Sequence, residues 1–85
     1  MTKIALVDDH VLLRNGLAPL INSFSGYTVL FEANSGKHMI ELIDANNLPD
    51  VVLLDITMPD MNGYETALWL TTHHPQVKIL ALTIL

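Results

Sequence analysis

Three carboxylates that follow apolar stretches are the residues of this sequence best placed to do chemistry. Asp8 and Asp9 directly follow the apolar run over residues 4–7, and Asp55 directly follows the run over residues 51–54. The four branched aliphatic residues of the second run indicate a strand that is buried on both faces, as in a parallel sheet covered by helices. We therefore expect both runs to be strands that deliver carboxylates to their carboxyl ends.

Carboxylates that meet at one edge of a sheet need a cation between them. In doubly wound parallel sheets, ligands bind beyond the carboxyl ends of the strands, where the winding direction reverses. If the strand order is 2-1-3-4, the first and third strands are neighbours, and Asp8, Asp9 and Asp55 should converge within a few ångströms. Oxygen ligands favour a hard ion, and a shallow site with room for water and a phosphoryl group suits Mg²⁺ better than Zn²⁺.

The predicted chemistry is attack of a carboxylate on phosphorus to form an acyl phosphate, with the metal neutralising charge on the transferring oxygens. Asp55 is the predicted nucleophile, because no other acid adjoins it. Asp9 is predicted to bind the metal directly, and Asp8 to bind it directly or through water. The backbone carbonyl of Thr57 is predicted to complete the metal site, and the hydroxyl of Thr83 to reach a phosphoryl oxygen.

The rest of the pattern alternates strands with helices, with Asp9 or His10 placed to cap the first helix, Ser35 the second and Asn62 the third. Strands are predicted over residues 4–7, 27–31, 51–55 and 77–82, and the first helix over 11–24. The second helix is predicted to follow Ser35 and to stop at residues 46–49, and the third to follow Asn62 and to close at residues 73–75. This order implies an α/β fold with a parallel sheet and right-handed crossovers.

Details of two helices and one strand refine this prediction. Pro19 lacks a hydrogen-bond donor and crowds the carbonyl four residues earlier, so we expect a kink near Asn15 or a helix that breaks and restarts. The strand over residues 27–31 is less uniformly apolar than the others and is expected at an edge of the sheet. The inner face of the third helix is predicted to consist of Tyr64, Ala67, Leu68 and Thr71.

The histidines and large aromatic residues are assigned structural roles. His10 is predicted to be a residue of the helix start that lies near the site without binding the metal. His73 and His74 are typical of a solvated helix end, where the helix dipole favours positive charge. Trp69 and Tyr64 are expected to pack against neighbours rather than to stack on a ligand.

Composition excludes several classes of function. The 85 residues amount to one domain at most, with a net charge of −5 that argues against unassisted binding of nucleic acid. The cations are scattered along the chain as Lys3, Arg14, Lys37 and Lys78. No cysteine is present to form a disulfide or a thiolate metal site, and no apolar stretch approaches the roughly 20 residues of a membrane span. A cytoplasmic location is therefore expected.

The motifs together resemble a response-regulator receiver domain of two-component signalling. They are the Asp8-Asp9 pair after the first strand, Asp55 after the third, the Met-Pro-Asp-Met-Asn-Gly loop over residues 58–63, and Thr83 after the fourth strand. The resemblance covers residues 1–85. The Asp-Asp-His start and the helix after it are similar to the branch whose receivers precede a DNA-binding helix-turn-helix output domain.

This resemblance implies a flavodoxin-like doubly wound sheet with strand order 2-1-3-4. It also implies that Asp55 accepts a phosphoryl group from the phosphohistidine of a histidine kinase, with Mg²⁺ as cofactor, and that Thr83 takes part in the switch that follows. On this view the chain is a phosphoryl acceptor rather than an enzyme, capable at most of self-phosphorylation and self-dephosphorylation.

The chain departs from the family at its end. Receivers have five strand–helix units. This sequence has no counterpart of the fourth helix, of the fifth strand with its lysine, or of the fifth helix, and it contains no helix-turn-helix segment. Ile84 follows Thr83 where the family usually has a small residue. The fourth strand is expected to expose an apolar edge over residues 79–82, and such edges pair with other chains. Self-association through this strand or the adjoining sheet face is the expected consequence.

Two other functions remain open at this point. A Mg²⁺-dependent phosphatase with an aspartate nucleophile usually places a second acid two residues after the nucleophile, and Thr57 stands there in this sequence. The chain is alternatively a dimerising fragment that has lost phosphorylation. A phosphoryl adduct on Asp55 would indicate a receiver, and repeated turnover of a phosphate ester would indicate a phosphatase. Neither result in a folded sample would favour the dimerising fragment.

Overall fold

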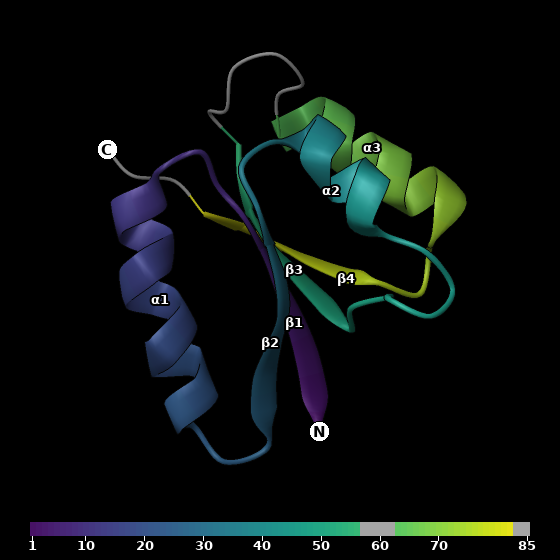
Figure 1. Ribbon diagram of the computed structural model, residues 1–85. Coiled ribbons are helices and arrows are strands. Elements are labelled where there is room, and N and C mark those ends of the chain that lie inside the picture. The colour runs from purple at the N-terminus through teal and green to yellow at the C-terminus, as the bar shows by residue number, and fades with distance from the viewer. Residues whose placement is uncertain (57–62, 83–85) are drawn as a thin grey trace.

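Apolar strands and amphipathic helices alternate along the chain, and the helices cover both faces of a parallel sheet (Figure 1). The computed structural model describes residues 1–56 and 63–82. The strands within these residues are β1 (Thr2–Val7), β2 (Tyr27–Ala33), β3 (Val51–Asp55) and β4 (Lys78–Leu82). The helices are α1 (Val11–Ser23), α2 (Gly36–Leu42) and α3 (Gly63–His73).

The described strands lie in the order β2-β1-β3-β4, and all neighbouring pairs are parallel. Helix α1 lies on one face of the sheet, and α2 and α3 lie together on the other (Figure 1). The winding direction reverses between β1 and β3, as in a flavodoxin-like sheet. The predicted fold class and strand order are confirmed.

The sheet has a separate apolar core on each of its faces. The core under α2 and α3 contains Ala5, Val7, Ala33, Met39, Ile43, Val52, Leu54, Leu70 and Val77. The core under α1 contains Ile4, Leu6, Ala18 and Ile21. Successive residues of a strand point to opposite faces, so β1 contributes alternate side chains to the two cores. Burial on both faces is confirmed for the apolar run of β1, which is buried throughout. In β3 it is confirmed only in part, because Val52 and Leu54 are buried whereas alternate residues on the α1 face are partly buried.

Helix α1 is continuous through Pro19, so the expected break does not occur. Ala18 and Ile21 are buried against the sheet, whereas Pro19 is exposed. Packing of the apolar face holds the helix together across the missing hydrogen bond, because most helical stability in proteins comes from such packing. A bend near Asn15 stays a prediction.

Two of the predicted helix caps lie within the described residues, and only one of them makes a capping hydrogen bond there. Ser35 caps α2, and its side-chain oxygen accepts a hydrogen bond from the backbone N–H of His38 at 3.1 Å. His10 occupies the N-cap position of α1, but within the described residues its side chain makes no capping hydrogen bond. The proposed cap of α3, Asn62, lies outside the described residues.

The predicted inner face of α3 is largely wrong. Tyr64 is 73% exposed and Leu68 is 68% exposed, and Thr71 is exposed as well. The buried residues of α3 are Gly63, Thr66 and Leu70, with Ala67 and Trp69 partly buried beside them. Four apolar residues in a row, from Ala67 to Leu70, leave the helix without a clear apolar stripe, so the periodicity could not choose the buried side.

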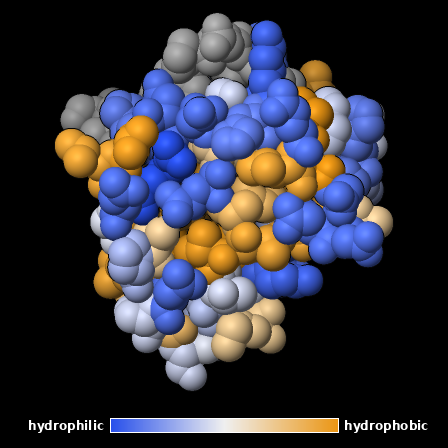
Figure 2. Space-filling model, viewed as in Figure 1, coloured by the Kyte–Doolittle hydropathy of each residue, from blue (hydrophilic) through white to orange (hydrophobic). Residues whose placement is uncertain are grey.

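The outer strands of the described sheet are β2 and β4, and the prediction that β2 lies at an edge is confirmed. In the face shown in Figure 2, hydrophobic side chains reach the surface between α1 and α2. At the other edge, Leu80 of β4 is 55% exposed.

Among the described residues, none of the helices has the length and apolar character needed to cross a membrane.

Candidate functional site

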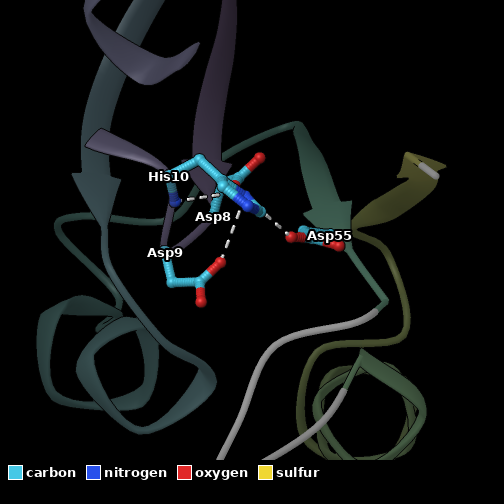
Figure 3. A network of polar contacts seen from close by, with 4 residues as sticks. All are labelled: Asp8, Asp9, His10 and Asp55. Atoms are coloured by element: carbon cyan, nitrogen blue, oxygen red, sulfur yellow. Dashed lines mark hydrogen bonds and ion pairs between the residues drawn. The ribbon is translucent and has the colours of Figure 1, made fainter. Parts of the chain in front are cut away.

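The candidate site lies where β1 and β3 end side by side. Val7 is paired with Leu54 in the parallel register, so the next residues, Asp8 and Asp55, leave the sheet next to each other. One ligand atom from each of Asp8, Asp9, His10 and Asp55 lies within 4.8 Å of every other one (Figure 3). The prediction that the three carboxylates converge is confirmed.

Backbone hydrogen bonds hold both strand ends in the sheet. The N–H of Asp8 donates to the carbonyl of Ala33 at 3.0 Å, which ties the end of β1 to β2. The N–H of Ile56 donates to the carbonyl of Leu82 at 3.4 Å, which ties the residue after Asp55 to β4. The two acids are therefore placed by strand pairing rather than by a long loop.

Burial divides the three acids into two kinds. Asp8 is 4% exposed and Asp55 is 3% exposed, whereas Asp9 is exposed. A buried carboxylate is costly unless hydrogen bonds or opposite charge compensate it. Asp8 and Asp55 thus form the floor of the site, and Asp9 lies on its open side.

Only one of the two carboxylate oxygens of Asp8 has hydrogen-bond partners within the described residues. Its Oδ1 accepts a hydrogen bond from the backbone N–H of His10 at 2.8 Å and lies 2.8 Å from His10 Nδ1. Its Oδ2 is buried and accepts no hydrogen bond from the described part of the chain. An orphaned buried carboxylate oxygen requires an explanation, and a cation supplies one.

His10 Nδ1 contacts all three carboxylates, which the sequence did not indicate. It lies 2.8 Å from Asp8, 3.3 Å from Asp9 Oδ1 and 3.5 Å from Asp55 Oδ2. The hydrogen bond with Asp8 raises the pKa of His10 above its ordinary value of 6.5. The charges of Asp8, Asp9 and Asp55 raise this pKa further, while partial desolvation opposes the shift. The one sequence signal for this contact was the position of His10 directly after the acid pair.

The donor set fits a hard divalent cation. Three carboxylates offer oxygen atoms within one small volume, and the orphaned oxygen of Asp8 belongs to this set. Oxygen ligands of this type are those that Mg²⁺ takes in proteins, together with water. The exposed position of Asp9 leaves one side of the site accessible to solvent.

The remaining predicted site residues lie outside the described residues. These are Thr57, whose carbonyl was expected to bind the metal, Thr83, whose hydroxyl was expected to reach a phosphoryl oxygen, and Ile84, which stands where the family usually has a small residue. Their roles stay predictions.

Residues 4–85 match the family described as the response regulator receiver domain. The chain is 37% identical over 82 residues to the transcriptional regulatory protein DegU of Brevibacillus brevis, a match that covers 96% of this chain and 34% of DegU. It is 48% identical over 63 residues to the nitrate/nitrite response regulator protein NarL of Escherichia coli, which covers 74% of this chain and 29% of NarL. The chain thus spans about a third of the length of these two relatives.

A solved structure shows the same arrangement of strands and helices. The crystal structure of a two-component response regulator of the LuxR family, from an Aurantimonas species, superposes with a TM-score of 0.89 at 32% sequence identity. The superposition covers 100% of this chain and 61% of that one. With a family match over nearly all of its residues and with its acids at the ends of β1 and β3, the chain belongs to the response regulator receiver domain family.

Proposed function

We propose that the chain is the phospho-acceptor domain of a two-component response regulator, in which Asp55 accepts a phosphoryl group from a histidine kinase in a Mg²⁺-dependent reaction. One observation carries this proposal. Asp55 is 3% exposed at the end of β3, and its carboxylate lies within 4.8 Å of ligand atoms of Asp8 and Asp9. A buried carboxylate next to a potential metal site is what acyl phosphate formation requires.

In the proposed step, a carboxylate oxygen of Asp55 attacks the phosphorus of the kinase phosphohistidine. The new O–P bond forms as the P–N bond breaks, and the kinase imidazole leaves and takes up a proton. When bound by Asp8, Asp9, Asp55 and the carbonyl of Thr57, Mg²⁺ supplies positive charge beside the transferring oxygens. The hydroxyl of Thr83 donates a hydrogen bond to the phosphoryl group and takes part in the switch.

The contacts of the three acids support Asp55 rather than Asp8 as the acceptor. Asp8 Oδ1 is engaged by the backbone and the ring of His10, which suits a ligand held in one orientation. Asp55 has no neighbouring acid in the sequence and ends the strand between β1 and β4. Transfer to Asp55 happens once per activation, so the chain acts as an acceptor and not as a turnover enzyme.

The larger protein is proposed to control transcription. DegU is named a transcriptional regulatory protein, and this chain covers only 34% of its length. We infer that a DNA-binding helix-turn-helix output accompanies the receiver in a cytoplasmic protein. The chain described here, with its net charge of −5, is proposed to contact the kinase and the output domain rather than DNA.

Intact mass spectrometry after incubation with Mg²⁺ and acetyl phosphate or phosphoramidate tests the acceptor. A single phosphoryl adduct is expected in the wild-type chain, and Asp55→Ala should abolish it. Asp44→Asn removes an exposed carboxylate after α2 and should keep the adduct. Chelation of Mg²⁺ should prevent labelling. A wild-type sample that is folded by circular dichroism but is never labelled would contradict the proposal.

A second candidate function, self-association through β4, has its own support. Within the described sheet β4 pairs only with β3, so its other edge carries unpaired backbone groups. Leu80 is 55% exposed on this strand, and Ala81 is exposed next to it. Edge strands of this kind pair with other chains. On this alternative the chain is a dimerising module, whether or not Asp55 is phosphorylated.

A further inference from the structure

We propose that His10 is a nitrogen ligand of the metal site, so that the chain binds a borderline divalent cation of the Ni²⁺ type more tightly than Mg²⁺. This inference rests on the metal site proposed above and assigns a residue to it that was expected to remain outside. It concerns the choice of metal and not the phosphoryl acceptor.

The position of the imidazole carries the proposal. His10 Nδ1 lies 2.8 Å from Asp8 Oδ1, 3.3 Å from Asp9 Oδ1 and 3.5 Å from Asp55 Oδ2. Adjacent ligand atoms around an octahedral cation with bonds of 2.0–2.1 Å stand about 3.0 Å apart. The nitrogen is therefore spaced from the carboxylate oxygens as a member of one coordination shell is. Figure 3 shows the ring reaching from the start of α1 toward Asp55.

An independent observation indicates that a cation belongs in this cluster. The side chain of Asp8 is 6% exposed, and its Oδ2 has no hydrogen-bond partner in the described part of the chain. Other residues of the cluster do not satisfy this oxygen, although His10 satisfies the second oxygen of the same carboxylate. A bound cation would compensate the buried charge.

The backbone holds His10 in place for this role. Its N–H donates to Asp8 Oδ1 at 2.8 Å, and its carbonyl accepts the N–H of Arg14 at 3.1 Å in the first turn of α1. These two bonds fix the residue between β1 and α1. Its side chain is 57% exposed, so a metal ion can approach from solvent.

The addition of one nitrogen ligand to an oxygen-only site alters the preferred metal. Carboxylate and water ligands suit Mg²⁺ and Mn²⁺, whereas imidazole suits iron, nickel, copper and zinc. Affinity for a given mixed site rises along the first-row series toward Cu²⁺. Binding through Nδ1 uses the neutral ring, so a proton held there passes to solvent when the metal enters. The contact between Nδ1 and Asp8 Oδ1 is then replaced by bonds of both atoms to the metal, while the backbone N–H of His10 still donates to Asp8 Oδ1.

Isothermal titration calorimetry of the 85-residue chain with Ni²⁺ and with Mg²⁺ tests the proposal. Wild-type chain should bind Ni²⁺ more tightly than Mg²⁺. His10→Ala should weaken Ni²⁺ binding about tenfold or more, because even the loss of a residue that only hydrogen-bonds a metal ligand typically costs that much, and it should change Mg²⁺ affinity much less. Paramagnetic broadening by Ni²⁺ should affect the His10 ring signals before those of other histidines.

Adjacent histidines elsewhere provide the matched control. His73 and His74 at the end of α3 offer imidazole nitrogens away from the acids and are the chain's most obvious adventitious Ni²⁺ ligands. The double variant His73→Ala with His74→Ala should keep the tight Ni²⁺ site. Loss of Ni²⁺ binding in this variant, with His10→Ala unaffected, would assign the ion to α3 and overturn the proposal.

The outcomes also separate this inference from the proposed function. If His10→Ala leaves Ni²⁺ affinity unchanged while Asp8→Asn weakens both metals, His10 is not a ligand and the carboxylate site still stands. If wild-type chain binds neither Mg²⁺ nor Ni²⁺, the metal site proposed for phosphoryl transfer fails together with this inference. Phosphorylation of Asp55 is measured separately by mass.

Discussion

Gly63, the first residue of α3, lies directly against Ile56, the residue after Asp55. A Cβ atom at Gly63 would clash with the backbone Cα of Ile56 and would lie 2.8 Å from its Cβ and 2.9 Å from its Cγ2. Real Cβ atoms essentially never come this close to other atoms. The absence of a side chain at residue 63 therefore allows the start of α3 to approach the end of the strand that carries the predicted acceptor.

Gly63→Ala is expected to destabilise the fold and to weaken Mg²⁺ binding. The added methyl group has to push Ile56 and the start of α3 apart, at a cost of about 1–3 kcal/mol for such overpacking. Displacement of Ile56 shifts Asp55 away from Asp8 and Asp9. Urea unfolding and Mg²⁺ titration of the folded protein measure the two effects.

Gly16→Ala is the matched control for this prediction. No atom of the described residues lies within 4 Å of a Cβ atom built on Gly16, which is exposed in the middle of α1. Alanine there should stabilise the helix by up to about 1 kcal/mol and leave Mg²⁺ affinity unchanged. Equal effects of the two substitutions on Mg²⁺ affinity would show that the approach of Gly63 to Ile56 does not position Asp55.

In the metal-free chain, His10 should titrate above its ordinary pKa of 6.5, chiefly because of its hydrogen bond with Asp8. The folded state then binds more protons than the unfolded state between the two pKa values. The contribution of His10 to stability is therefore complete below pH 6.5 and is lost as the pH rises through the folded-state pKa.

Proton NMR of the His10 ring in the presence of a chelator measures this pKa directly. Asp8→Asn should move the pKa of His10 back toward 6.5, because it removes the largest favourable contribution. Urea unfolding of the His10→Ala variant should show a weaker loss of stability between acid and mildly alkaline pH than the wild type does. A wild-type His10 that titrates at or below 6.5 would be incompatible with its contacts in the structure.

Asn22 should contribute to stability at the place where β2 changes register. Its Oδ1 accepts a hydrogen bond from the backbone N–H of Val29 at 2.8 Å, next to the irregularity at which β1 pairs first with Val29 and then with Phe31. Asn22→Ala leaves this N–H without its acceptor, and urea unfolding should show a loss of about 0.5–1.5 kcal/mol. Asn15→Ala, an exposed change in the same helix, should stay within about 0.5 kcal/mol of wild type.

If β4 mediates self-association, sedimentation velocity should show a concentration-dependent dimer at tens of micromolar. Leu80→Lys places a charge on the exposed edge strand and should shift the chain to monomer, because charged edge residues disfavour strand pairing. Leu12→Lys alters an even more exposed leucine on α1 and should leave the dimer intact. A wild-type monomer across this concentration range would remove the second candidate function.

Local patterns were sufficient to predict the strands and the acids at their ends, whereas the strand order was implied by the resemblance to receiver domains. The runs that end at Asp8 and Asp55 are apolar throughout, which indicates strands buried on both faces whatever their neighbours are. Parallel strands align their carboxyl ends at one edge, so the acids had to meet there once the order was known. Ser35 as a helix cap was equally predictable, because capping depends on residues a few positions apart.

Tertiary packing alone decided which way several side chains point. Hydropathy could not orient α3, because four successive apolar residues place an apolar group on every side of the helix. The contact of His10 with three carboxylates depends on how β1 turns into α1 beside the end of β3. The approach of Gly63 to Ile56 likewise depends on where α3 packs. Residue types determined which elements form and where the acids lie, whereas the orientation of each side chain was settled only by the neighbours it packs against.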